Sequence, residues 1–110
     1  MSTMYDYTGW IVRATAGRDK DGLFCVVGVD QAQMRLLLAD GKPRKFARPK
    51  PKDVNHVKLL ARPKGGGPRY VEPLNGEFDH PDIQKLTQGE ALSDKALRRA
   101  LAAFRDQLEV

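Results

Sequence analysis

The stretch GRDKDGLFCVVGV, residues 17–29, decides the fold that the sequence predicts. It starts with charged residues between Gly17 and Gly22 and continues with residues 23–29, which are almost wholly apolar. A short apolar run next to a turn signal predicts a strand that is buried on both faces, and the glycine-bounded charges predict the loop before it. This loop is then either a plain hairpin connection or the feature that the buried strand holds in place.

Further short strands are expected on both sides of this stretch. Residues 10–16, WIVRATA, are β-branched and aromatic, and residues 54–60, VNHVKLL, alternate between apolar and polar. The DG pair at residues 40–41 predicts a turn, while Pro49 and Pro51 keep their segment out of the centre of any sheet because proline lacks an amide donor. The expected strands are residues 10–16, 23–30, 35–39, 44–47 and 54–60. Five short strands joined by tight turns predict a small closed β-barrel.

The last third of the chain is expected to be helical, which gives a mainly β fold with α. Pro81 suits the first position of a short helix and Gly89 suits its end, and Ser93 suits the N-cap of a longer one. The longer helix carries one apolar stripe, formed by Leu97, Leu101, Phe104 and Leu108. We divide the chain into an N-terminal arm (1–8), a barrel (9–61), a linker or flexible loop (62–78) and a helical C-terminal segment (79–110).

Positive charge is concentrated in the first two-thirds of the chain. The 110 residues carry a net charge of +5, but residues 1–71 alone contain 14 Lys and Arg against 6 Asp and Glu. The run KPRKFARPKPK, residues 42–52, holds six cations and no acid, and its prolines favour an extended backbone. Such a run is either a solvated strand edge or a surface that neutralises phosphates and releases counterions. Phe46 and Tyr70 are candidates for stacking on an unpaired base.

Catalytic and metal chemistry find little support in the sequence. The one cysteine, Cys25, excludes an intrachain disulfide and a multi-cysteine metal site, and only two serines are present. Asp79, His80 and Asp82 are typical of a helix start, with Asp79 as its N-cap, rather than of a metal site. We expect a non-catalytic protein without a metal or cofactor. Because no secretory signal and no apolar run of membrane-spanning length are visible, we expect a reducing, cytoplasmic setting.

Several of these motifs follow one another in a set order. The segments AGRDK, LLADGK, KPK and HVKLL occur in that order within residues 9–60, about half of the chain. Over this region the sequence resembles the KOW-type RNA-binding proteins, especially small bacterial proteins similar to eukaryotic and archaeal large-subunit ribosomal proteins. The resemblance implies an SH3-like barrel whose loop at residues 17–22 and neighbouring basic loops contact RNA. Where this motif usually has a glycine, the sequence has Asp21, and Gly22 follows one position later.

The resemblance and the basic run together predict a protein that binds RNA, structured ribosomal RNA in particular, as a ribosome-associated or assembly protein. The residues expected to contact RNA are Arg18, Lys20, Lys42, Arg44, Lys45, Arg48, Lys50 and Lys52. Two alternatives remain open: a protein-interaction module that docks ribosomal or transcription proteins through the stripe of the C-terminal helix, and a DNA-binding barrel. We expect a monomer whose partners are RNA and ribosomal proteins.

Overall fold

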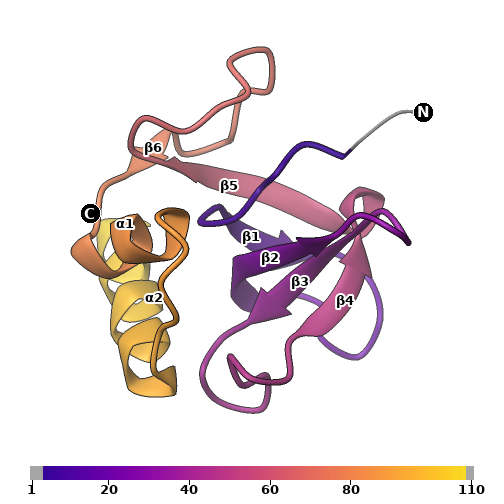
Figure 1. The fold of residues 1–110 in the computed structure, drawn as a ribbon, viewed down its shortest axis with the longest axis horizontal. Coiled ribbons are helices and arrows are strands. Elements are labelled where there is room, and N and C mark those ends of the chain that lie inside the picture. Colours follow the sequence, from indigo (N-terminus) through magenta and orange to yellow (C-terminus); the bar gives the residue numbers. More distant parts are fainter. Residues whose placement is uncertain (1–3, 109–110) are drawn as a thin grey trace.

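The fold places six strands before two helices. The computed structural model describes residues 4–108. The elements are β1 (Ile11–Ala14), β2 (Leu23–Asp30), β3 (Arg35–Ala39), β4 (Lys50–Asp53), β5 (Val57–Pro63), β6 (Glu77–Phe78), α1 (Pro81–Thr87) and α2 (Asp94–Leu108), with a 3₁₀ turn at Val54–His56 (Figure 1). The predicted order, a β-sheet followed by a helical C-terminal segment, is confirmed.

The strands form one open sheet in the order β4-β3-β2-β1-β5-β6. Neighbouring strands are antiparallel except β5 and β6, which run parallel. Irregular register steps at Ile11/Val12 and at Val26/Gly28 bend the sheet and increase its twist. β4 and β6 are its edges, and no ladder joins β4 to β5 within residues 4–108, so the expected closed barrel is not observed.

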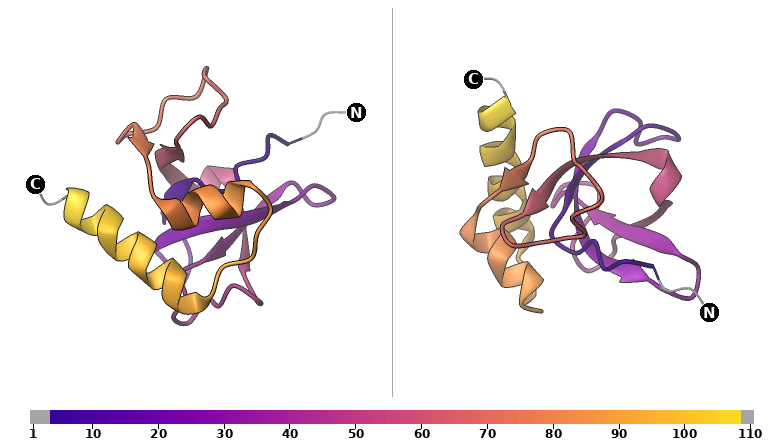
Figure 2. Two further views of the ribbon diagram at one scale, coloured as in Figure 1. Left: turned by 60° about the vertical axis from the view of Figure 1, so that its left-hand side comes forward. Right: turned by 90° about the horizontal axis from the view of Figure 1, so that it is seen from above.

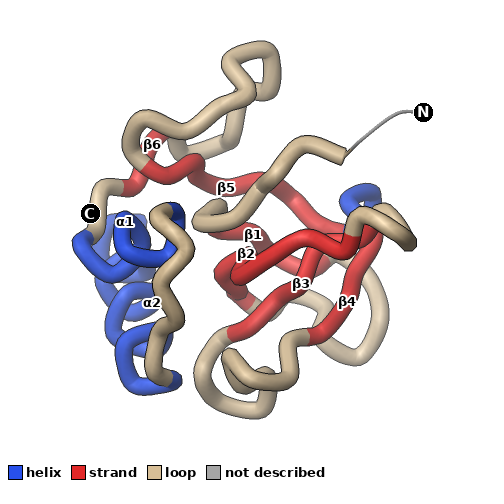
Figure 3. The backbone as a smooth tube through the Cα atoms, in the orientation of Figure 1, coloured by secondary structure: helices blue, strands red, loops and turns tan. Residues whose placement is uncertain are grey.

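Both faces of β1 and of the first half of β2 contribute buried residues, as predicted for residues 23–26, whereas residues 27–29 of the apolar run are half-buried. One apolar cluster contains Ile11 and Cys25 together with residues of both helices. The cluster on the opposite face contains Val12 and Phe24. Because successive side chains of a strand point to opposite faces, β1 and β2 contribute to both clusters. Figure 3 shows the two helices together on one side of the sheet, where they cover the first cluster.

The apolar stripe of α2 belongs to the protein's own core. Leu97, Leu101 and Phe104 are buried, and the Phe104 ring meets the Phe78 ring edge-on at a centroid distance of 5.2 Å. Ser93 caps the helix as predicted, because its Oγ accepts a hydrogen bond from a first-turn amide at 3.0 Å. These three stripe residues are therefore not exposed for a partner protein to contact.

α1 starts at Pro81 as predicted, but its N-cap is His80 rather than Asp79. His80 Nδ1 accepts a hydrogen bond from Asp82 N at 3.1 Å. Asp79 instead lies outside the helix, where its Oδ2 is 3.6 Å from Lys64 Nζ. A histidine nitrogen thus takes the capping role that the sequence pattern assigned to the preceding carboxylate.

The fourth and fifth strands differ from the prediction. Residues 44–47 lie in a loop, and β4 is formed by the proline-containing segment that follows. β4 is an edge strand, the position in a sheet where a proline without an amide donor is tolerated. β5 starts at Val57 rather than at residue 54, because Asp53 caps the 3₁₀ turn by accepting a hydrogen bond from Asn55 N at 2.8 Å.

Residues 62–78, expected as a linker or flexible loop, begin as the end of β5 and finish as β6. The loop between these strands is tied to the core. Trp10 Nε1 donates a hydrogen bond to Gly67 O at 3.1 Å, and Arg62, of which only 6% is exposed, donates to two loop carbonyls. The Arg62 guanidinium also lies over the Trp10 ring, 5.7 Å from its centroid.

The N-terminal arm is tied to the turn between β2 and β3. Met4 and Gln31 exchange two hydrogen bonds, of 2.9 and 2.8 Å, and the Tyr7 ring meets Trp10 edge-on at 5.2 Å. Residues 1–3 of the predicted arm and residues 109–110 of the predicted helical segment lie outside the described residues.

Candidate nucleic-acid interface

The predicted RNA-binding residues come from two loops and an edge strand at one end of the sheet. At this end β1 and β3 finish while β2 and β4 begin, as their antiparallel registers show. The β1–β2 loop carries Arg18 and Lys20, the β3–β4 loop carries Lys42, Arg44, Lys45 and Arg48, and β4 carries Lys50 and Lys52. Figure 3 draws both loops in tan, away from β6.

Backbone hydrogen bonds fold the β1–β2 loop into a fixed turn. Ala14 N donates to Gly22 O at 3.0 Å, and Asp21 N donates to Ala14 O at 2.8 Å. Arg18 and Lys20, at the tip of the turn, are exposed. Ala14, at the end of β1, therefore holds the charged loop that leads into β2 in a defined shape, which lowers the conformational entropy that the loop loses on binding.

Asp21 adopts a left-handed backbone conformation that glycine prefers. Its φ is +72°, at the position where the resemblance places a glycine. Aspartate tolerates this conformation better than a β-branched residue does. We expect Asp21→Gly to change the free energy of unfolding by less than about 1 kcal/mol, and Asp21→Val to lower it by about 1–2 kcal/mol. Urea denaturation measures both, and a valine variant as stable as the glycine variant would contradict the left-handed conformation.

The β3–β4 loop is held by an aspartate at its start and by α2. Asp40 Oδ1 accepts hydrogen bonds from Lys42 N at 2.9 Å and from Arg44 N at 3.0 Å, which fold the loop back on itself. Phe46 N donates to Asp94 Oδ1, in the first turn of α2, at 2.8 Å. These side chains take up amides that a strand would pair with its neighbour, which explains why this segment is a loop.

Gly41 is the point where the loop meets α2 most closely. A Cβ added to Gly41 would lie 2.3 Å from Asp94 O, and the φ of this glycine is +79°. The guanidinium of Arg98 donates a hydrogen bond to Gly41 O at 2.7 Å. The loop is therefore fixed against the N-terminal turns of α2, and Arg98 is brought next to the cations of the loop.

An ion pair joins the two loops. Asp19 Oδ2 lies 2.9 Å from Arg44 Nη2, and 15% of the Asp19 side chain and 29% of the Arg44 side chain are exposed. The sequence leaves open whether Asp19 braces the cations beside it or only cancels their charge. Asp19 pairs instead with a cation of the other loop, and neither Arg18 nor Lys20 forms an ion pair within residues 4–108.

Lys52, in β4, contacts the β1–β2 loop through a buried ammonium group. Only 8% of the residue is exposed, and its Nζ donates a hydrogen bond to Ala16 O at 2.7 Å. A buried ammonium group needs such a partner, because it has lost its contact with water. This contact connects β4 with the β1–β2 loop, and the expected contact of Lys52 with RNA stays a prediction.

Replacing Lys52 by methionine separates these two roles. We expect the free energy of unfolding to fall by about 1 kcal/mol, because Ala16 O loses its donor. We expect the salt dependence of RNA binding to stay that of the wild type, since no phosphate contact is lost. Denaturation and binding assays at several salt concentrations measure the two effects. A slope of log K against log salt that is shallower by about one unit would show instead that Lys52 contacts a phosphate.

Five of the eight predicted cations are exposed, and all five lie on the two joined loops. Arg18, Lys20, Lys42, Lys45 and Arg48 are exposed, and Lys50 is half-buried. The two remaining predicted residues, Arg44 and Lys52, hold the loops in place. The structure thus divides the predicted set into cations that face solvent and cations that position them.

α2 adds cations that the sequence pattern did not connect to these loops. Arg98, bonded to Gly41 O, is exposed, and Lys95, three residues earlier, is exposed on the same face of the helix. In the sequence, the three-residue spacing of Lys95 and Arg98 on the predicted helix was the signal that places both cations on one face. The contact between the helix and the loop joins residues 57 positions apart, so local patterns did not reveal it.

The other candidate residues lie elsewhere. Tyr70, the second stacking candidate, is 85% exposed. It lies in the loop between β5 and β6, at the opposite end of the molecule from the β3–β4 loop (Figure 1; Figure 2, left). Complete burial raises the pKa of the Cys25 thiol to about 12, which suits a core residue rather than a nucleophile at neutral pH.

Two further features concern the described part of the chain. Among residues 4–108, no three His, Cys, Asp or Glu side chains are arranged to hold a metal ion. No helix in the same range combines the length and the apolar character needed to cross a membrane.

Comparison of the chain with protein-family models and with curated proteins finds no match. The two joined loops, their exposed cations and their contact with α2 are therefore the basis for a functional proposal.

Proposed function

We propose that this protein binds RNA without catalysis, by neutralising phosphates with the exposed cations of the β1–β2 and β3–β4 loops. The observation that carries the proposal is the ion pair between Asp19 and Arg44, because it joins two loops that each present cations to solvent. Each phosphate that is neutralised releases counterions, and cations on fixed loops lose little entropy on binding. The proposed ligand is structured ribosomal RNA, bound in the cytoplasm by a ribosome-associated or assembly protein.

The arrangement of β1–β5 supports the proposed relationship to KOW-type proteins. β1 pairs with both β2 and β5, and the bent sheet encloses an apolar cluster that includes Trp10 and Val12. The proposed relationship interprets this open sheet as an SH3-like barrel that does not close. The left-handed φ of Asp21 gives the β1–β2 loop the backbone conformation that a glycine at this position of the motif would adopt.

The proposed preference for RNA over DNA depends on shape. Phosphate contacts position a protein but carry no sequence information, and A-form RNA differs from B-form DNA in groove width and phosphate spacing. DNA binding remains the alternative that the charges equally allow. The protein-interaction alternative loses the observation that favoured it, because the α2 stripe packs in the core.

Fluorescence anisotropy with a labelled fragment of structured ribosomal RNA, and with a DNA duplex of matched sequence, tests the proposal. We expect binding that weakens as salt rises, with a slope of log K against log salt of about −3 to −4 if most of the exposed loop cations contact phosphates. We expect the DNA duplex to bind more weakly at every salt concentration. An RNA affinity that is absent at low salt, or that does not change with salt, would contradict the proposal.

A further inference from the structure

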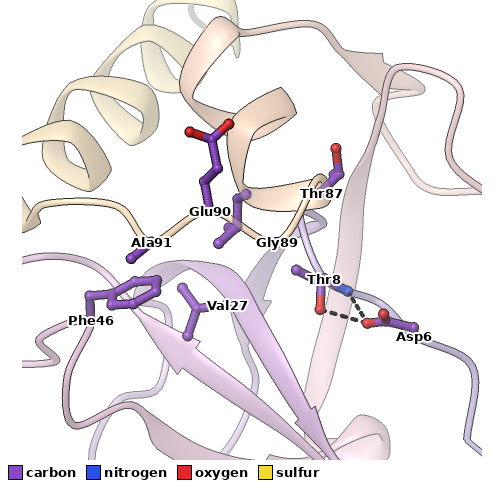
Figure 4. A pocket seen from close by; sticks show the side chains of 9 residues that line it. Asp6, Thr8, Val27, Phe46, Thr87, Gly89, Glu90 and Ala91 are labelled. Carbon is purple, nitrogen blue, oxygen red and sulfur yellow. Dashed lines mark hydrogen bonds between the residues drawn. The ribbon is translucent and has the colours of Figure 1, made fainter.

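A pocket of about 440 Å³ opens beside the β3–β4 loop, between the N-terminal arm, β2 and the connection from α1 to α2. Figure 4 shows Phe46, Val27 and Ala91 close together at one end of this pocket, and Thr8 and Asp6 at the other. The pocket thus has an apolar end with an aromatic ring and a polar end with a carboxylate. A volume of this size is in the range of small-molecule sites.

We propose that this pocket receives one unpaired base of the bound RNA, stacked on Phe46, and prefers guanine to uracil. The inference rests on the proposed function, because Lys45 and Arg48 flank Phe46 in the same loop and supply the phosphate contacts beside the pocket. Proteins that read RNA sequence commonly do so on unpaired bases that stack on aromatic side chains.

Phe46 is held in place for such a contact. Its backbone N donates to Asp94 Oδ1 at 2.8 Å, and its half-buried ring packs against the core cluster under the helices. The remaining surface of the ring lines the pocket. A base that stacks there covers apolar surface without the cost of first ordering the ring.

The polar end of the pocket offers hydrogen-bond acceptors. Asp6 Oδ1 accepts from Thr8 N at 3.0 Å and from Thr8 Oγ1 at 2.5 Å, so the Thr8 hydroxyl proton is already used and its oxygen is left as an acceptor. An ionised carboxylate also only accepts. The Watson–Crick edge of guanine carries N1–H and N2–H₂ donors, whereas uracil presents two carbonyl oxygens and one N–H. Acceptors therefore favour guanine.

The charges around the pocket also favour a neutral base that belongs to an RNA strand. The carboxylates of Asp6 and Glu90, which both line the pocket, disfavour a phosphate inside it, so the phosphates stay on the cationic loop. Lys45 and Arg48 disfavour the approach of a basic peptide, which would otherwise suit the carboxylates. A neutral base attached to a negatively charged strand satisfies both conditions.

Two single-stranded RNA pentanucleotides of equal charge, UUGUU and UUUUU, test the proposal with the full chain. We expect UUGUU to bind at least about fivefold more tightly, and in ¹H–¹⁵N spectra we expect it alone to shift the amides of Val27, Phe46 and residues 87–91. Asp6→Asn replaces one acceptor by a donor and should bring the affinity ratio close to one. Asp106→Asn is the matched control, because it makes the same change at an exposed carboxylate of α2 that does not line the pocket. This control variant should keep the wild-type ratio of the UUGUU and UUUUU affinities.

Phe46→Ala should weaken UUGUU more than UUUUU, and its spectrum shows whether the variant is folded. Equal affinities of the two pentanucleotides for the wild type would overturn the pocket proposal, as would unmoved pocket amides or a lysine tripeptide that shifts those amides more than UUGUU does. The Asp6→Asn and Asp106→Asn variants keep the proposal falsifiable if Phe46→Ala does not fold. Salt-dependent binding of both pentanucleotides without any preference would overturn the pocket alone, whereas no binding of either would also count against the proposed function.

Discussion

Charge reversal at both Lys45 and Arg48 is expected to weaken RNA binding about 100-fold at roughly 100 mM salt. Both side chains are exposed in the β3–β4 loop, which Asp40 and α2 hold in place. Two glutamates would remove two phosphate contacts and add two repulsions. The slope of log K against log salt should become shallower by about two units. Fluorescence anisotropy over a range of salt concentrations measures both quantities.

The matched control is charge reversal at both Lys64 and Arg69. It changes the net charge by the same amount, and these side chains are 65% and 71% exposed. Both residues belong to the loop between β5 and β6, away from the β3–β4 loop (Figure 1). We expect this variant to lose less than about threefold in affinity. Equal losses in the two double variants would mean that the overall positive field, and not the joined loops, attracts the RNA.

Gly41→Ala is expected to lower the free energy of unfolding by about 2–4 kcal/mol. The added Cβ would lie 2.3 Å from Asp94 O, a backbone atom of α2, and the φ of +79° is unfavourable for alanine. Relief requires the β3–β4 loop to move away from the helix. The hydrogen bond from Arg98 to Gly41 O then weakens as well. We therefore expect weaker RNA binding in addition to a melting temperature lower by roughly 10 °C or more.

Gly65→Ala separates the two causes of the lost stability, the close contact and the positive φ. Gly65 has a similar φ of +75°, but no atom lies within 4 Å of the position that its Cβ would take. This variant should lose only about 1 kcal/mol, and its RNA affinity should stay that of the wild type. Thermal and urea denaturation compare the two glycines. If both alanine variants lost the same stability, the close approach of the loop to α2 would be contradicted.

Elements whose signals lie within a few residues were predicted well. β3 has the predicted bounds. β2 begins directly after the glycine-bounded loop and covers the predicted residues 23–30. α2 begins after Ser93, whose capping role depends only on the residues that follow it. In these segments, local propensity and the buried environment favour the same structure, so pattern alone was sufficient.

Elements that depend on distant partners were not predicted. Residues 44–47 follow a turn signal and were expected to form a strand, but Asp40 and Asp94 bind their loop amides. β6 has two residues and exists only because it pairs with the end of β5. The same reason applies to the site: the sequence supplied the cations, but neither the burial of Lys52 nor the contact between Arg98 and Gly41 O follows from spacing along the chain.

The most direct test of the RNA-binding surface is a ¹H–¹⁵N titration of the full chain with the ribosomal RNA fragment, repeated with the matched DNA duplex. The proposal predicts that RNA shifts amides in the β1–β2 loop at Arg18 and Lys20 and in the β3–β4 loop at residues 42–48, together with the first turns of α2. It also predicts little change in the loop between β5 and β6. Shifts centred on that loop, or spread evenly over the molecule with the two cationic loops unaffected, would contradict it.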